Sequence, residues 1–218
     1  MNLGKKFYKY YYTIFFLKSK DKKTILLTIF EIYCIIIYVN EKIMGACMKK
    51  AVIVINGAGG VGKDTLCELA AKHFRVYNIS SITPIKKVAR NFGWQGEKTD
   101  KARKFLADLK AVAVEYNDYP TRWAEERYQE FLRGDDTIMF VHIREPEEIK
   151  KFVDITGGNA KTLLVRGGSR MTKSVYGNAA DDMVEGYNYD YYFVNEKGFA
   201  EAERDFVSLL EKIINGGK

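Results

Sequence analysis

Residues Gly57 to Thr65 read GAGGVGKDT, which fits the pattern G-x-x-x-x-G-K and places Asp64 where such stretches usually carry Ser or Thr. The stretch follows an apolar run, AVIVIN at residues 51–56, and precedes residues 63–74, in which apolar side chains recur at helical spacing. Glycines allow successive backbone N–H groups to converge on one anion, and the N-terminus of a following helix adds a favourable dipole. A strand, a glycine-rich loop and a helix in this order therefore predict a phosphate-binding loop, or P-loop.

The side chains of this loop have expected tasks. Lys63 is expected to reach the β- and γ-phosphates of a nucleoside triphosphate, and Thr65 to contact the α-phosphate. Asp64 is expected to hold Mg²⁺, directly or through a water molecule, because Mg²⁺ keeps several waters in proteins; a helix-capping carboxylate is the alternative. The predicted ATP-binding residues of the loop are Gly57, Ala58, Gly59, Gly60, Val61, Gly62, Lys63, Asp64 and Thr65.

The rest of the chain alternates between apolar runs and stretches with helical periodicity. Strands are expected at residues 51–56, 75–80, 137–143, 161–165 and 191–194. Strands that alternate with helices predict an α/β fold, here a five-stranded parallel sheet with helices on both faces, as in the P-loop NTPase fold. A helical insertion is expected at about residues 92–134, and a short lid at the polar, glycine-containing residues 167–189.

The first 47 residues differ in composition from the others. They carry eight Lys and three acidic residues, so most of the net charge of +7 lies there and the remainder is nearly neutral, which argues against a nucleic-acid partner. We expect residues 1–47 to be an atypical extension and residues 48–218 to form the domain, with Met48 as the functional start. A membrane anchor and an appendage outside any membrane are the alternatives, although the apolar stretch 24–39 is short for a span and contains Glu31.

Cysteine and histidine are scarce. The three cysteines show no pairing or metal-ligand spacing, and only two histidines are present, so a zinc site and a disulfide framework are not expected. This usage is typical of the reducing cytoplasm, which is the expected location.

Five motifs together resemble the deoxynucleoside monophosphate kinase family of bacteriophages and bacteria, over about residues 49–214. They are Gly62-Lys63-Asp64-Thr65, Thr83-Pro84-Ile85-Lys86, KARKFL at 101–106, Val141-His-Ile-Arg144 followed by Glu147 and Glu148, and Tyr189-Asp190 to Asn195. The P-loop is the most specific motif, and phosphomevalonate kinases share some of the others. The family usually has Asp where His142 stands and Asn where Glu147 stands.

The resemblance assigns further residues. It implies that Lys86 and Arg103 lie near the acceptor phosphate and that Asn195 borders the nucleotide base. Arg166, Arg170 and Lys173 flank the expected lid, which in such kinases brings positive charge over the transferring phosphoryl group. Arg166 is therefore taken as acceptor-binding and Arg170 as catalytic.

Arg144 follows an inner strand, at the sheet edge where open α/β sheets bind ligands. Its guanidinium could grip a phosphate with two hydrogen bonds, and an ion pair with Glu147 or Glu148 is the alternative. Lys63 and Arg144 are accordingly expected to be catalytic, and Arg144 also to bind the acceptor.

These features predict ATP-dependent phosphoryl transfer, with Mg²⁺, to a small phosphorylated acceptor, above all a (deoxy)nucleoside monophosphate. No acidic residue follows the strand at 75–80, which suits an acceptor that is already ionised and needs no base. Trp94, Trp123 or Tyr128 could stack on its base, although core packing is the expected role of each. Another small-molecule kinase, of the dephospho-coenzyme A or phosphomevalonate type, and a membrane-tethered protein that binds ATP without catalysis are the alternatives.

Overall fold

The computed structural model describes residues 49–168 and 184–216, and these form the fold reported below. Along the chain the elements are β1 (Ala51–Asn56), α3 (Lys63–Ala70), β2 (Val76–Ser80), α4 (Thr83–Asn91), α5 (Asp100–Asn117), α6 (Tyr119–Arg133), β3 (Ile138–His142), α7 (Pro146–Ile155), β4 (Lys161–Gly167), the 3₁₀ turn η1 (Val184–Gly186), β5 (Tyr191–Asn195) and α9 (Phe199–Ile214). Within these residues, no helix has both the length and the apolar character needed to cross a membrane. The extension at 1–47 and most of the expected lid lie outside the described residues.

The five strands form one parallel sheet in the order β2-β3-β1-β4-β5. The strand that leads into the P-loop is thus central, and every residue of β1 is buried. A parallel sheet of this order, with the P-loop after its central strand, is the P-loop NTPase fold that the sequence predicts, and the five-stranded α/β prediction is confirmed.

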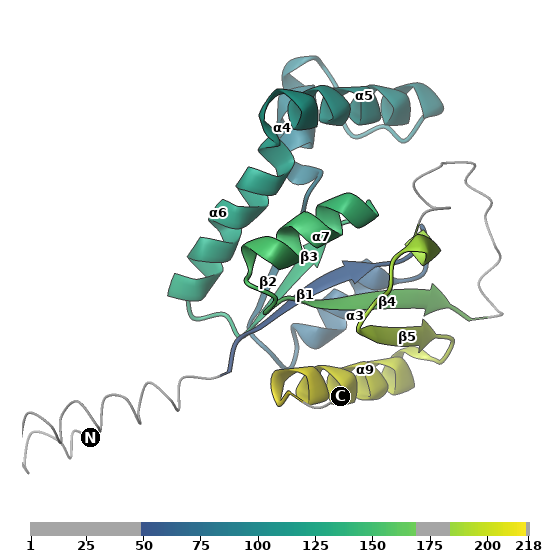
Figure 1. The fold of residues 1–218 in the computed structure, drawn as a ribbon. Helices are drawn as coiled ribbons and strands as arrows, with labels where there is room; N and C mark the ends of the chain where they lie inside the picture. Colours follow the sequence, from purple (N-terminus) through teal and green to yellow (C-terminus); the bar gives the residue numbers. More distant parts are fainter. Residues whose placement is uncertain (1–48, 169–183, 217–218) are drawn as a thin grey trace, which may run out of the picture. The chain divides into compact units, whose positions relative to one another are not determined.

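Alternate residues of β1 enter two different cores. Ala51, Ile53 and Ile55 pack with α3 and α9 on one face, whereas Val52 and Val54 pack with α6 and α7 on the other. Figure 1 shows α6 and α7 on one side of the sheet and α9 on the opposite side. Burial on both faces explains why the strand reads as an unbroken apolar run.

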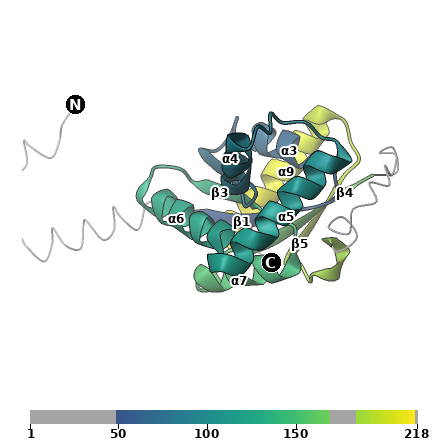
Figure 2. The same ribbon diagram turned by 90° about the horizontal axis from the view of Figure 1, so that it is seen from above.

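Two helices of the expected insertion, α5 and α6, follow β2 and precede β3 along the chain. Together they form an arm, in which α6 lies beside the sheet and α5 lies farther out (Figures 1 and 2). The main partners of α5 are α4 and α6 rather than the sheet, and Ala102 is its one buried residue. Tyr116 shares the helical spacing of Ala102 but is 85% exposed, because no described element covers the outer end of α5.

The first helix is shorter than the periodicity suggests. It ends at Ala70 rather than near Phe74, because the next backbone N–H groups, of Lys72 and His73, bond three residues back and form turns.

Gly57 gives a test of the P-loop packing. A Cβ atom at Gly57, where φ is +149°, would lie 2.3 Å from the carbonyl oxygen of Val165, whereas a Cβ at Gly60, with φ +79°, would meet no atom within 4 Å. We expect Gly57→Ala to lower the free energy of unfolding by about 2 kcal/mol or more, and Gly60→Ala, which meets only backbone strain, by about 1 kcal/mol. Urea unfolding of both variants measures this, and equal losses would contradict the close approach to β4.

Candidate functional site

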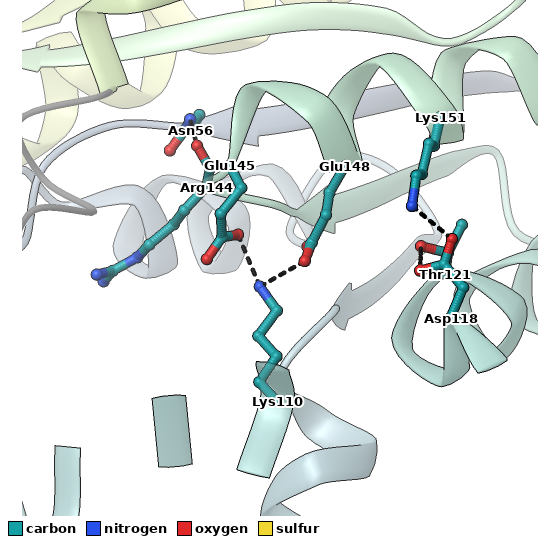
Figure 3. A network of polar contacts seen from close by, with 8 residues as sticks. All are labelled: Asn56, Lys110, Asp118, Thr121, Arg144, Glu145, Glu148 and Lys151. Carbon is teal, nitrogen blue, oxygen red and sulfur yellow. Dashed lines mark hydrogen bonds and ion pairs between the residues drawn. The ribbon is translucent and has the colours of Figure 1, made fainter. Parts of the chain in front are cut away.

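The pairing of β1 with β3 brings the P-loop beside the end of β3. Ile55 lies opposite His142, so the chain leaves both strands at neighbouring positions. Buried Asn56 fixes the junction: its side-chain NH₂ donates to the carbonyl oxygen of Arg144 at 3.0 Å (Figure 3). The same NH₂ donates to the Tyr189 hydroxyl at 2.7 Å, and the side-chain oxygen of Asn56 accepts from Gly57 N at 2.8 Å. Sequence reasoning missed Asn56, although a polar residue closing an apolar strand was a usable signal.

The P-loop has the backbone shape that its glycines allow. Gly60 and Gly62 have positive φ, and α3 begins at Lys63 directly after Gly62. The Lys63 ammonium donates to the carbonyl oxygens of Gly57 and Ala58, so it is folded over its own loop. The Asn195 side chain, at the end of β5, donates to Val61 O at 2.9 Å and therefore lies against the loop.

His142 lies between the P-loop helix and β2. Its Nε2 is 2.9 Å from Asn78 Oδ1, and its Nδ1 is 3.8 Å from Asp64 Oδ1. Burial lowers the pKa of His142 to about 4, and Lys63 and Arg144 add to this shift against the opposing effect of Asp64. The imidazole is accordingly neutral at physiological pH.

Cys67 lies on the Nε2 side of the same ring, with its sulfur 3.8 Å from that nitrogen. Burial, aided by the Asp64 charge, raises the pKa of Cys67 to about 12. Cys67 is therefore a protonated thiol, which is a poor metal ligand and a poor nucleophile.

A cavity of about 610 Å³ opens beside the P-loop, and the predicted site residues Gly59, Gly60, Lys63, Asp64, Lys86, Arg103 and Arg144 line it. Five cationic and two acidic side chains line it: Lys63, Lys86, Arg103, Lys110, Arg144, Asp64 and Glu145. The cavity thus has a cationic wall beside a P-loop, which is an arrangement suited to two phosphate-bearing molecules.

Lys110 reaches from α5 to the start of α7. Its ammonium lies 2.7 Å from Glu145 Oε2 and 2.8 Å from Glu148 Oε1 (Figure 3). Burial acts to raise the pKa of both carboxyl groups. At Glu145 the Lys110 charge outweighs burial, so the pKa is lowered. At Glu148 the pKa stays raised, because the neighbouring Glu145 charge adds to the effect of burial against that of Lys110. Sequence reasoning took Glu148 as a candidate partner of Arg144, and the structure gives it to Lys110 instead.

A second ion pair joins the arm to α7. Lys151 donates to Asp118 at 2.7 Å, and the Thr121 hydroxyl donates to the other oxygen of Asp118 at 2.8 Å (Figure 3). Burial acts to raise the pKa of Asp118, but Lys151 and Thr121 hold it below its usual value. Two charged contacts on one face of α7 therefore hold the arm beside the cavity.

A smaller cavity of about 240 Å³ adjoins the other side of α3. Thr65, Leu66 and Leu69 line it together with the loop from Asn195 to Phe199. This is where the resemblance expects a nucleotide base, and contact with a base stays a prediction.

Arg166, which is predicted to bind the acceptor, lines neither cavity. Arg166 donates to both oxygens of Glu185, at 3.0 and 2.6 Å, and covers the Tyr192 ring. Arg170 and Lys173 lie outside the described residues, so their expected roles stay predictions.

The aromatic residues named for base stacking do not line the large cavity. Tyr128 is buried in the core, Trp123 packs against that core, and the Trp94 indole donates to Glu97 O. Core packing is thus confirmed for Trp123 and Tyr128, whose rings α6 turns toward the sheet, whereas Trp94 bonds within its own loop.

No protein-family model matches the chain, and no curated protein matches it. Among solved structures, it is similar to a gluconokinase from Sinorhizobium meliloti, at 13% identity over 78% of this chain and 95% of that one, with a TM-score of 0.47. It is also similar to a shikimate kinase from Aquifex aeolicus, at 11% identity over 76% of this chain and 99% of that one, with a TM-score of 0.42. A third similar structure is an APS kinase from Mycobacterium tuberculosis solved with AMPPNP and APS, at 15% identity over 75% of this chain and 98% of that one, with a TM-score of 0.37. At these identities and TM-scores, nothing about the substrate of this chain follows from these proteins.

Lys110 offers a test of how the arm is held. Lys110→Ala leaves two carboxylates close together and largely buried, so we expect a loss of about 3 kcal/mol in unfolding free energy. The control is Lys104→Ala on the same helix, because the Lys104–Asp108 pair is exposed and should contribute about 0.5 kcal/mol or less. Denaturant titration measures the unfolding free energy of both variants. Equal losses would contradict the stabilising role of the Lys110 cluster.

Proposed function

We propose that this protein is a kinase that transfers the γ-phosphoryl group of ATP to a small phosphorylated acceptor. The observation that carries the proposal is that Lys63 of the P-loop and Arg144 of β3 line one cavity. One cation suits the donor phosphates and the other suits the acceptor, and a shared cavity lets the two meet. The domain responsible is proposed to be residues 48–218.

The donor is proposed to lie along the P-loop. Its phosphates would take the backbone N–H groups from Gly57 to Thr65, and Lys63 would exchange its contacts with Gly57 and Ala58 for phosphate oxygens. Its base would enter the smaller cavity beside Thr65 and Asn195. Asp64, whose side chain is 90% exposed, could hold Mg²⁺; such an ion neutralises charge on the phosphates.

The acceptor is proposed to lie in the larger cavity. Arg144 would hold its phosphate in a bidentate manner, with Lys86 of α4 and Arg103 of α5 on the arm side. The resemblance supports a (deoxy)nucleoside monophosphate as the acceptor. Arg166 would join the acceptor only after leaving Glu185, and Arg170 is proposed to stabilise the transferring group.

The chemistry would be direct in-line transfer, in which positioning and electrostatics supply most of the rate. Lys63 and Arg144 would stabilise the charge that spreads over the moving phosphoryl group. One observation favours a hydroxyl acceptor, because Glu145 places in the cavity a carboxylate that could act as a general base. Lys110 lowers the pKa of Glu145, however, which weakens it as a base and favours the phosphate acceptor.

Lys63 tests the donor half of the proposal. Lys63→Ala removes the cation expected at the β- and γ-phosphates, so turnover should fall by about a hundred-fold or more while the far-ultraviolet circular dichroism stays unchanged. ADP release in the presence of deoxy- and ribonucleoside monophosphates measures the effect. Undiminished turnover in a folded variant would remove Lys63 from the mechanism.

Arg144 tests the acceptor half. Losing a charge-assisted contact costs about 1.5–3 kcal/mol, so Arg144→Ala should raise the acceptor KM or lower kcat by roughly ten-fold to a hundred-fold, with ATP affinity little changed. Arg90→Ala is the matched control, because Arg90 is an exposed cation on α4 outside the cavity. If dephospho-coenzyme A stimulates ADP release and no monophosphate does, the acceptor is a hydroxyl and this half is overturned.

A further inference from the structure

The ring of His142 is held with one nitrogen directed at the P-loop. With the Asn78 amide oriented so that its Oδ1 accepts, the 2.9 Å contact assigns the proton to His142 Nε2. Nδ1 then carries a lone pair, and the Asp64 carboxylate oxygen lies 3.8 Å from it. Two acceptor atoms thus face each other with no proton between them.

A divalent cation would satisfy both acceptors. Metal bonds to imidazole nitrogen and carboxylate oxygen measure about 2.0–2.2 Å, so two such atoms on one ion commonly lie about 3 Å apart. The exposed Asp64 side chain needs to move by less than about 1 Å to reach that separation, whereas Asn78 already fixes the ring, as hydrogen-bonded partners of metal-binding histidines do. Lys63 and Asp64 line the same cavity as His142, so the ion would lie beside the donor phosphates.

We propose that His142 Nδ1 and Asp64 together bind the divalent ion that accompanies the nucleotide, and that this pair favours Mn²⁺ over Mg²⁺. Imidazole nitrogen suits transition-metal ions, whereas Mg²⁺ prefers oxygen ligands alone. The inference rests on the proposed nucleotide binding. Among residues 49–168 and 184–216 no group of three or more His, Cys, Asp or Glu side chains could hold a metal, so phosphate oxygens and water complete the ligand set.

The chain offers a clean spectroscopic test because it contains only two histidines. His73 is on the surface against Glu203, at 2.8 Å, and serves as the matched control. Pulsed electron paramagnetic resonance of the full chain with Mn²⁺ and ADP reports two couplings: ³¹P shows the ion on the nucleotide, and ¹⁴N shows an imidazole ligand. Both couplings are expected in the wild type and in His73→Ala, and only ³¹P in His142→Ala and His142→Asp.

Binding isotherms give an independent readout. His142→Ala should weaken Mn²⁺·ADP by about ten-fold or more and Mg²⁺·ADP by about two-fold or less, and His142→Asp, which supplies a carboxylate, should shift the preference toward Mg²⁺. Binding of both nucleotide complexes without ¹⁴N coupling in the wild type would overturn the metal pair and leave the kinase proposal standing. If neither Mn²⁺·ADP nor Mg²⁺·ADP binds, the proposed nucleotide binding is overturned, and the metal pair that rests on it is overturned as well.

Discussion

The parallel pairing of β1 with β3 is the constraint on which the site depends. It sets Ile55 opposite His142, so the P-loop and the residues after β3 leave the sheet side by side. Asn56 then bonds to the backbone of both segments and to Tyr189. A slip of this register would separate Lys63 from Arg144 and would leave buried polar groups of Asn56 without partners, which costs about 1–3 kcal/mol for each group.

Charge is distributed unevenly around the large cavity. Glu145 and Glu148 enclose the Lys110 ammonium, so Lys110 contributes more to holding the arm than to attracting an anion. Lys86, Arg103 and Arg144 supply the cationic wall. The same cavity therefore separates Lys110, which two carboxylates hold, from the cations that are proposed to bind the acceptor.

Much of the fold could be predicted because its signals are local. An apolar run, a glycine-rich loop and helical periodicity identify β1, the P-loop and α3 within one continuous stretch, and the carboxyl end of β3 places Arg144 at the cavity. The Lys110 cluster could not be predicted, because Lys110 is 35 or more positions from both carboxylates and charged residues on helices have many possible partners. Tyr116 shows the converse: an apolar residue at the right spacing stays exposed where no neighbouring element covers it.

A single residue forms the joint between the two helices of the arm. Asp118 joins α5 to α6 with φ of +53°, the left-handed conformation, and it is the only non-glycine residue with positive φ among the residues that the structure describes. A helix of 18 residues is about 27 Å long, so a rotation of about 10° at this joint would carry the far end of α5 by roughly 5 Å. A change at this one joint would thus reshape the cavity for a longer or shorter molecule, because Arg103 and Lys110 of α5 line it, while the P-loop stayed as it is.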